Sequence, residues 1–205
     1  MKFLHIDSSP LGSNSVSRQL TAHAVGALKT AHPEAQIDYL DLVEHAPSHL
    51  NLNSLGFRLG TTAADLTPVQ REENDISERL VQQFIDANVV VIGAPMYNFS
   101  VPTQLKAWMD RIAQAGRTFQ YTAEGPKGLA GGKTVIVVST RGGFYFGKPH
   151  EPMMDHQEAY LKGFFGFLGI TDIRIVRAEG LGTGESAKAE AITNAETSLA
   201  SAVTI

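Results

Sequence analysis

Residues 88–100 read NVVVIGAPMYNFS, and this stretch decides the fold. A strand is predicted over Asn88–Ala94, because the run of apolar residues is typical of a central parallel strand covered on both faces. Pro95 ends the strand, and the apolar spacing within residues 105–112 predicts a helix soon afterwards. The loop between strand and helix presents four side chains of different chemistry, namely Met96, Tyr97, Asn98 and Phe99.

Outward from this strand, short apolar runs alternate with amphipathic ones. Further strands are predicted at Lys2–Ile6, Ile37–Leu42, Thr134–Thr140 and Ile173–Val176. Further helices are predicted over Val16–Lys29, from Pro68 after a Thr67 N-cap, over Met154–Leu168 and over Ser186–Val203. This alternation predicts an α/β fold, a doubly wound five-stranded parallel sheet with helices on both faces, in a single domain of residues 1–205. Residues 43–66 and 116–132 are expected to be irregular.

Composition narrows the function classes. The chain has 205 residues, a formal net charge of −4 and no cysteine. The missing cysteine excludes disulfides, thiolate nucleophiles and cysteine-based zinc or iron–sulfur sites. The mild negative charge gives no sign of a nucleic-acid or membrane-surface partner. No run approaches the roughly 18 apolar residues of a membrane span and no signal peptide opens the chain, so a cytoplasmic protein is expected.

In a doubly wound sheet, ligands bind outside the carboxyl ends of the strands, so the loops that follow three of the strands matter most. Loop one (residues 8–17) reads SSPLGSNSVS and enters a helix near Ser15. Free N–H groups at a helix start bind anions, and the serine and asparagine side chains add neutral donors, which together suit a phosphate. The same residues also favour an ordinary cap and turn. Neither a G-x-G-x-x-G nor a Walker motif is present.

Loop two (residues 95–102) and loop three (residues 141–152) complete the edge. The soft and aromatic side chains of loop two suit a planar heteroaromatic ring, although isolated aromatics in such loops usually pack into the core. The two glycines after Arg141 allow close backbone approach to a ligand, and Arg141 offers a positive charge; the alternative is a plain glycine turn. A phosphate at one end and a planar ring at the other together describe flavin mononucleotide (FMN).

Other groups of candidate residues give little sign of a metal site or of acid–base catalysis. A proline separates His45 from His49, which argues against the helix that a metal-binding pair at this spacing needs. His150, Asp155 and His156 form the next candidate cluster, but such side chains are usually just solvated, so no metal site is predicted. No nucleophile elbow or paired acid and base is visible. A flavin carries hydride chemistry on its own ring, so no protein side chain is expected to be catalytic.

Several blocks carry a family likeness: APMYNF followed by QLKAW, TFQYTAEGPKGL, TRGG and FLGITDI. On these blocks the chain, from its first strand to about Gly184, resembles the FMN-dependent NADH-azoreductases of the flavodoxin-like quinone reductase superfamily. The resemblance implies strand order 2-1-3-4-5, one non-covalent FMN per subunit, and a homodimer with active sites at the interface. It also implies a ping-pong reaction, in which NADH or NADPH delivers a hydride to flavin N5 and a quinone or azo compound then takes two electrons.

The resemblance also assigns residues. The phosphate would meet Ser9, Ser15, Val16 and Ser17; the ring and ribityl chain would meet Met96, Tyr97, Asn98 and Phe99; the pyrimidine edge would meet Thr140, Arg141, Gly142 and Gly143. The substrate pocket would be lined by Phe99, Phe119, Tyr121 and Phe144, with Phe119 and Tyr121 near the dimer partner.

Two segments depart from the shared blocks, residues 51–66 and the run FYFGKPHEPMMDH at residues 144–156. Both are expected to border the substrate face, and they leave acceptor preference and the choice between NADH and NADPH open. Two other functions stay open beside the enzyme: an electron carrier without a nicotinamide site, and a binding or sensing protein without turnover.

Overall fold

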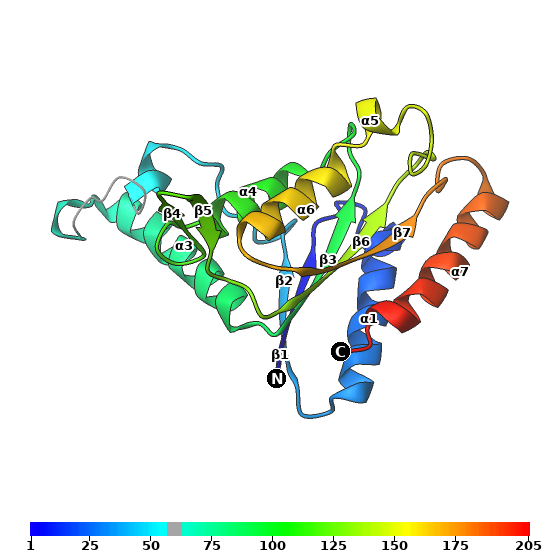
Figure 1. The fold of residues 1–205 in the computed structure, drawn as a ribbon, viewed down its shortest axis with the longest axis horizontal. Coiled ribbons are helices and arrows are strands. Elements are labelled where there is room, and N and C mark those ends of the chain that lie inside the picture. Colours follow the sequence, from blue (N-terminus) through cyan, green and yellow to red (C-terminus); the bar gives the residue numbers. More distant parts are fainter. Residues whose placement is uncertain (57–62) are drawn as a thin grey trace.

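Five parallel strands form the main sheet of the protein, in the order β2-β1-β3-β6-β7 (Figure 1). The computed structural model describes residues 1–56 and 63–205, and all five strands lie in these ranges. The strands are β1 (Lys2–Asp7), β2 (Gln36–Asp41), β3 (Val89–Pro95), β6 (Thr134–Thr140) and β7 (Asp172–Ala178). Every residue of β3 is buried, as its apolar sequence predicts. The observed order is consistent with the expected order 2-1-3-4-5.

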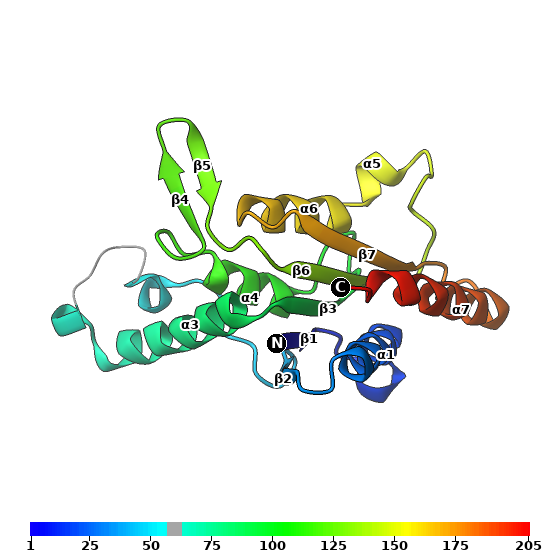
Figure 2. The same ribbon diagram turned by 60° about the horizontal axis from the view of Figure 1, so that its bottom comes forward.

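Helices cover both faces of this sheet, as Figure 2 shows. One face packs on α1 (Val16–Ala31) and α7 (Glu185–Ala202), and the other packs on α3 (Pro68–Asp86), α4 (Thr103–Ile112) and α6 (Gln157–Phe167). Alternate residues of the central strands therefore enter two separate apolar clusters. The capping box predicted at the start of α3 is present, with Thr67 and Gln70 each accepting from the other's backbone N–H.

The predicted helix over Met154–Leu168 is wrong at its start. Met154 ends a separate short helix, α5 (Glu151–Met154), and α6 begins only at Gln157. The carboxylate of Asp155 accepts the backbone N–H groups of Gln157 and Glu158 and so opens a new helix after the break.

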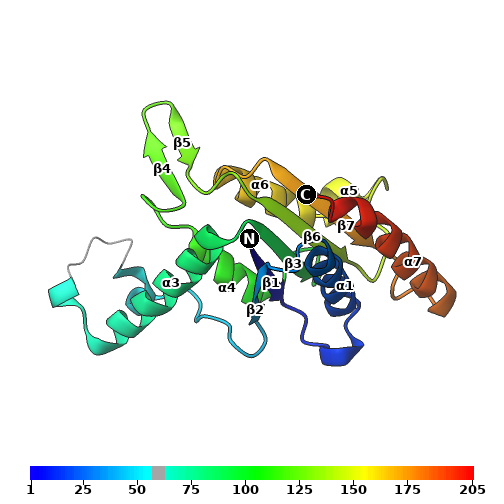
Figure 3. The ribbon, with the colours of Figure 1, turned by 90° about the horizontal axis from the view of Figure 1, so that it is seen from below.

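The segment 116–132 is not irregular, because it holds an antiparallel hairpin of β4 (Phe119–Thr122) and β5 (Gly125–Gly128). Figure 3 shows the hairpin standing away from the main sheet. Its base rests on the end of α6, where a Cβ added at Gly128 would lie 2.1 Å from the backbone nitrogen of Gly169. This contact brings two backbones together and tolerates no side chain at Gly128.

Strand register brings the candidate loops to one edge. Asp7 at the end of β1 pairs with Gly93 of β3, and Pro95 at the end of β3 pairs with Thr140 at the end of β6. Loops one, two and three therefore leave the sheet side by side, as the parallel arrangement predicts.

Candidate functional site

Loop one forms a cradle of unpaired donors at the start of α1. Ser15 caps the helix by accepting the backbone N–H of Arg18, and its hydroxyl lies 3.0 Å from that of Ser17. Ser9, Ser15 and Ser17 are all at most 2% exposed. Within the described residues, the backbone N–H groups of Val16 and Ser17 have no acceptor. A helix start with free N–H groups and neutral hydroxyls fits a phosphate group.

Ser8 differs from its neighbours, because its hydroxyl donates to the carbonyl of Gly93 at 2.6 Å. That bond ties loop one to β3 and leaves Ser8 with a structural role. Arg18 holds the loop from the other side, where its Nε donates to the carbonyl of Ser9 and its two terminal nitrogens bind the carboxylate of Asp41 at 2.6 and 2.7 Å. The hydrogen bond from Arg18 lowers the pKa of Asp41 and raises that of Arg18, so the pair stays charged at neutral pH.

A buried carboxylate lies beneath this cradle. Asp7 accepts hydrogen bonds from the hydroxyls of Thr21 at 2.8 Å and Tyr39 at 3.1 Å. Burial, followed by the charge of Asp7, raises the pKa of Tyr39 to about 12, so its hydroxyl stays a donor at neutral pH. A Cβ at Gly93 would approach Asp7 Oδ1 to 2.9 Å, so this glycine is needed where β3 passes the cradle.

Loop two folds into a tight reverse turn. The N–H of Tyr97 donates to the carbonyl of Ser100 at 2.9 Å, and the N–H of Ser100 donates back at 3.1 Å. The two central residues, Asn98 (φ 47°) and Phe99 (φ 72°), are the only non-glycine residues with positive φ in the described ranges. Left-handed conformations cost free energy for ordinary residues and concentrate at binding sites.

The turn keeps its side chains out of the core. Tyr97 is 37% exposed and Phe99 is 38% exposed, so the alternative that these rings pack inside does not hold. A cavity of about 360 Å³ lies between Pro10 of loop one and the Tyr97–Asn98 side of loop two. The Asn98 side chain makes no hydrogen bond with any described residue, which leaves its amide available to a ligand.

Loop three offers backbone donors. The carbonyls of Gly142 and Gly143 accept from Gly182 and Gly180, whereas the two glycine N–H groups have no acceptor among the described residues. The Thr140 carbonyl accepts from the N–H of Met96 at 2.8 Å, which fixes loop two against loop three. Free N–H groups beside exposed aromatic rings suit the polar edge of a planar ligand.

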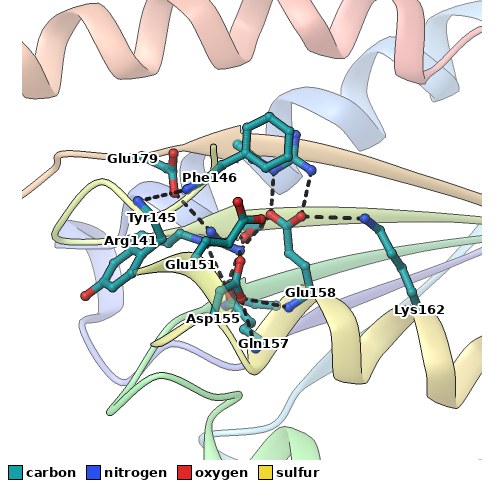
Figure 4. A network of polar contacts seen from close by, with 12 residues as sticks. Arg141, Tyr145, Phe146, Glu151, Asp155, Gln157, Glu158, Lys162 and Glu179 are labelled. Carbon is teal, nitrogen blue, oxygen red and sulfur yellow. Dashed lines mark hydrogen bonds and ion pairs between the residues drawn. The ribbon is translucent and has the colours of Figure 1, made fainter. Parts of the chain in front are cut away.

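Arg141 does not present its charge to this edge. Its side chain is fully buried and forms ion pairs with Asp155 at 2.8 Å, Glu158 at 2.8 Å and Glu179 at 3.0 Å (Figure 4). Its backbone N–H and carbonyl are also bonded, to Ala178 and Leu181. The expected positive charge for a ligand is therefore engaged inside the protein instead.

The expected substrate pocket is only partly assembled within this chain. Phe119 is 8% exposed and packs against Phe167, with ring centroids 4.5 Å apart, while Tyr121 on the hairpin is 76% exposed. Both belong to the hairpin at the far end of α6, away from loops two and three (Figure 2). The structure therefore does not bring them together with Phe99.

Phe144 is exposed but turns away from Phe99. Its ring lies over Gly180, where a Cβ would come within 2.2 Å of Phe144 Cζ, and it borders a groove of about 370 Å³ beside α7. The ring that meets Phe99 is Tyr145, at 6.3 Å between centroids. Sequence reasoning missed Tyr145 because three aromatics lie within residues 144–146 and nothing in their order tells which one faces loop two.

Other sequence features give no site. The described residues contain no group of three or more histidine, aspartate or glutamate side chains arranged to hold a metal ion. Residues 57–62, within the segment expected to border the substrate face, lie outside the described ranges. No helix in the described parts of the chain combines the length and apolar character needed to cross a membrane.

Comparison with known proteins agrees with this geometry. A family model described as "Flavodoxin-like fold" matches residues 1–203. A protein of Polaromonas naphthalenivorans named FMN-dependent NADH:quinone oxidoreductase is 63% identical over 95% of this chain and 90% of its own length. One of the same name from Delftia acidovorans is 58% identical over 97% and 93%.

Solved structures point the same way. An FMN-dependent NADH-azoreductase of Bacillus anthracis, solved in complex with FMN, is 29% identical with a TM-score of 0.91, over 99% of this chain and 97% of its own. An azoreductase of the Sterne strain of that organism is 27% identical with a TM-score of 0.90, over the whole of both chains. On the family model and these identities, this chain belongs to the flavodoxin-like family, among the FMN-dependent NADH:quinone oxidoreductases and azoreductases.

Proposed function

We propose that this chain is an FMN-dependent NADH:quinone oxidoreductase that also cleaves aromatic azo compounds. The observation that carries the proposal is the meeting of three unpaired donor sets at one sheet edge. These are the N–H groups of Val16 and Ser17, the amide of Asn98, and the N–H groups of Gly142 and Gly143. Their chemistry fits a phosphate, a ribityl chain and the polar edge of a flavin, in the order in which FMN carries them.

The residues of this chain bind and orient, and none is proposed to exchange a proton with the substrate. When bound, FMN supplies a ring that accepts a hydride at N5 and passes two electrons on. Loop one would hold the phosphate, and the exposed ring of Phe99, packed edge to face on the half-buried ring of Tyr145, would offer an apolar surface beside the loops. Flat apolar rings favour stacking by quinones, azo compounds and nicotinamide.

We further propose a ping-pong order, a homodimer and a single domain over residues 1–205. The ping-pong order is proposed because the three loops meet at one edge of the sheet, where donor and acceptor would occupy the same site in turn. The dimer is supported by Phe119 and Tyr121, which the expected pocket includes and which this chain places too far from Phe99 to complete the pocket alone. NADH is proposed as the donor because the relatives carry it in their names.

The test is an absorbance spectrum of the purified protein before and after anaerobic NADH. Flavin bands that bleach with NADH, and return when a quinone is added, are the expected result. A flavin spectrum that neither NADH nor NADPH bleaches would identify an electron carrier instead. A colourless protein that also fails to bind added FMN would refute the assignment of loops one to three.

A further inference from the structure

Gln157 joins two central strands at the edge where the ligand loops leave the sheet (Figure 4). Its side chain is fully buried. The amide nitrogen donates to the carbonyl of Ala94 at 2.7 Å, and the amide oxygen accepts from Ser139 Oγ at 3.0 Å and from Arg141 Nε at 3.1 Å. A single glutamine thus connects the end of β3, the end of β6 and loop three.

The bond to Ala94 is made near the end of the β3–β6 pairing. β1 pairs with β3 only as far as Gly93, whereas Ala94 still pairs with Ser139 of β6. Gln157 donates to the Ala94 carbonyl and accepts from the Ser139 hydroxyl, so one side chain binds both members of this strand pair. The residue before it, His156, donates its backbone N–H to the carbonyl of Phe99 at 3.0 Å. The first turn of α6 therefore holds both the end of β3 and the left-handed residue of loop two.

Arg141 extends this network to loop three. One terminal nitrogen pairs with Asp155, which also accepts the backbone N–H of Gln157. The other pairs with Glu179, whose Oε1 accepts the backbone N–H groups of Tyr145 at 3.0 Å and Phe146 at 3.1 Å. The ring of Tyr145 is thereby fixed opposite Phe99 through Glu179 and Arg141.

We infer that Gln157 and Arg141 are positioning residues that set the two acceptor-facing rings, Phe99 and Tyr145, without touching cofactor or substrate themselves. The inference rests on the proposed function for the identity of the acceptor. It accounts for a conformation at Phe99 that needs surrounding contacts to persist. It also accounts for the burial of one guanidinium with three carboxylates directly beneath the site. A purely apolar core would stabilise the fold equally well, so stability alone does not explain this group of ion pairs.

The test compares Gln157→Glu and Gln157→Met. The methionine has similar volume but none of the three hydrogen bonds, so the KM for a quinone is expected to rise about tenfold while kcat changes less than about twofold, because the rings that orient the acceptor lose their supports. At neutral pH the glutamate variant is expected to behave alike, because its ionised carboxyl cannot donate to Ala94 and faces Asp155 and Glu158 beside Arg141.

Lowering the pH separates positioning from simple loss of stability. Burial and the neighbouring carboxylates of Asp155 and Glu158 favour the protonated form of the new carboxyl. At about pH 5 its O–H can therefore donate to the carbonyl of Ala94. The ratio of KM in Gln157→Glu to KM in the unaltered protein is then expected to fall toward one, whereas the ratio for Gln157→Met stays high. A flat ratio in the glutamate variant would overturn the inference.

The matched control is Gln114→Glu. Gln114 is also buried, at 6% exposure, but follows α4 at the opposite end of that helix from loop two. Its KM is expected to stay within about twofold of the unaltered value. If the Gln157 variants fail to fold, Ser139→Ala removes one of the three hydrogen bonds and is expected to raise KM about two- to threefold. An unchanged KM in a folded Ser139→Ala or Gln157→Met protein would contradict the inference while leaving the proposed function intact.

A second readout needs no turnover. In FMN-free protein, amide hydrogen exchange at His156 and Tyr145 is expected to quicken at least tenfold in Gln157→Met, with no change at residues 134–138. Unaltered exchange at both amides would refute the positioning role. Failure of the unaltered protein to oxidise NADH would refute the proposed function, and the exchange result would still decide the positioning of the loops.

Discussion

At the scale of single residues, Asn98 and Phe99 are the least ordinary part of the molecule. Two consecutive non-glycine residues adopt positive φ in an exposed turn. Asparagine tolerates this conformation better than most residues, whereas phenylalanine has no local reason to adopt it. Backbone bonds from Ser100 to Tyr97 and from His156 to Phe99 hold the turn in place. Such a conformation is held where a side chain must point in a required direction.

Two substitutions of Asn98 distinguish the contribution of its side-chain amide from that of its left-handed backbone conformation. Asn98→Gly keeps the left-handed conformation but loses the amide. The FMN dissociation constant should therefore rise about fivefold, which corresponds to the roughly 1 kcal/mol that one hydrogen bond contributes. Asn98→Ala loses the amide and adds about 1 kcal/mol of backbone strain. The alanine variant should therefore bind FMN more weakly than the glycine variant and unfold at lower urea concentration.

Fluorescence titration of FMN-free protein measures both dissociation constants, and urea unfolding followed by circular dichroism measures stability. Equal FMN affinity in all three proteins would show that Asn98 does not contact the cofactor. Equal stability of the alanine and glycine variants would show that the turn relaxes without cost.

Arg141 shows what the sequence could not predict about a single residue. The position of Arg141 after a buried strand is readable from TVIVVSTRGG, but its direction is not. An arginine at a sheet edge is more often exposed than buried, because burial needs several partners at once. Those partners, Asp155, Glu158 and Glu179, are distant in sequence and come together only in the fold.

At the scale of elements, the long apolar strands could be predicted from the sequence, whereas the short strands of the hairpin could not. The strand predicted at Thr134–Thr140 has those bounds in the structure, and β3 differs from its prediction by one residue at each end. The hairpin of β4 and β5 was missed, since GPKG has no strand-like pattern and its pairing is stabilised by docking on α6. Similarly, Gln157 lies between two polar residues, so its sequence context resembles a solvated helix start.

The link between α1 and β2 gives a prediction about pH. The bond from Arg18 lowers the folded-state pKa of Asp41, so the stabilisation from this pair is present above about pH 4 and is lost as the pH falls through the folded-state value. Asp41→Asn should lower the free energy of unfolding by about 1–2 kcal/mol at pH 7, with a difference from the unaltered protein that shrinks toward pH 3.

Urea unfolding at pH 7, 5 and 3 measures this difference. Asp172→Asn provides a comparison, because Asp172 also pairs with an arginine, Arg174, but is 43% exposed at its side chain. Water screens such a pair, so the loss should be smaller. A difference for Asp41→Asn that stays constant across the three pH values would contradict the assignment.

At the scale of the whole molecule, the sheet edge and the hairpin lie at opposite ends of α6 (Figure 1). The parallel topology placed loops one, two and three together, and that much followed from the sequence by a general rule. The completion of the pocket did not follow, because Phe119 and Tyr121 lie on the hairpin, away from loops two and three.

The oligomeric state is therefore predicted to be a dimer. Light scattering at micromolar concentration should give about 44 kDa, twice the chain mass of 22.1 kDa. Tyr121→Glu on the exposed hairpin should shift the mass toward that of the monomer, because a charge at an apolar contact costs affinity. A mass of 22 kDa for the unaltered protein would contradict the prediction.

The contact between Gly128 and Gly169 limits which substitutions the chain tolerates at these two positions. A side chain at Gly128 meets the backbone of the α6 end, and one at Gly169 meets the backbone of β5, so no single compensating substitution makes room. The hairpin and the end of α6 must therefore diverge together or remain fixed. Grafting a hairpin from a relative onto this chain should succeed only when the residues after α6 are transferred with it.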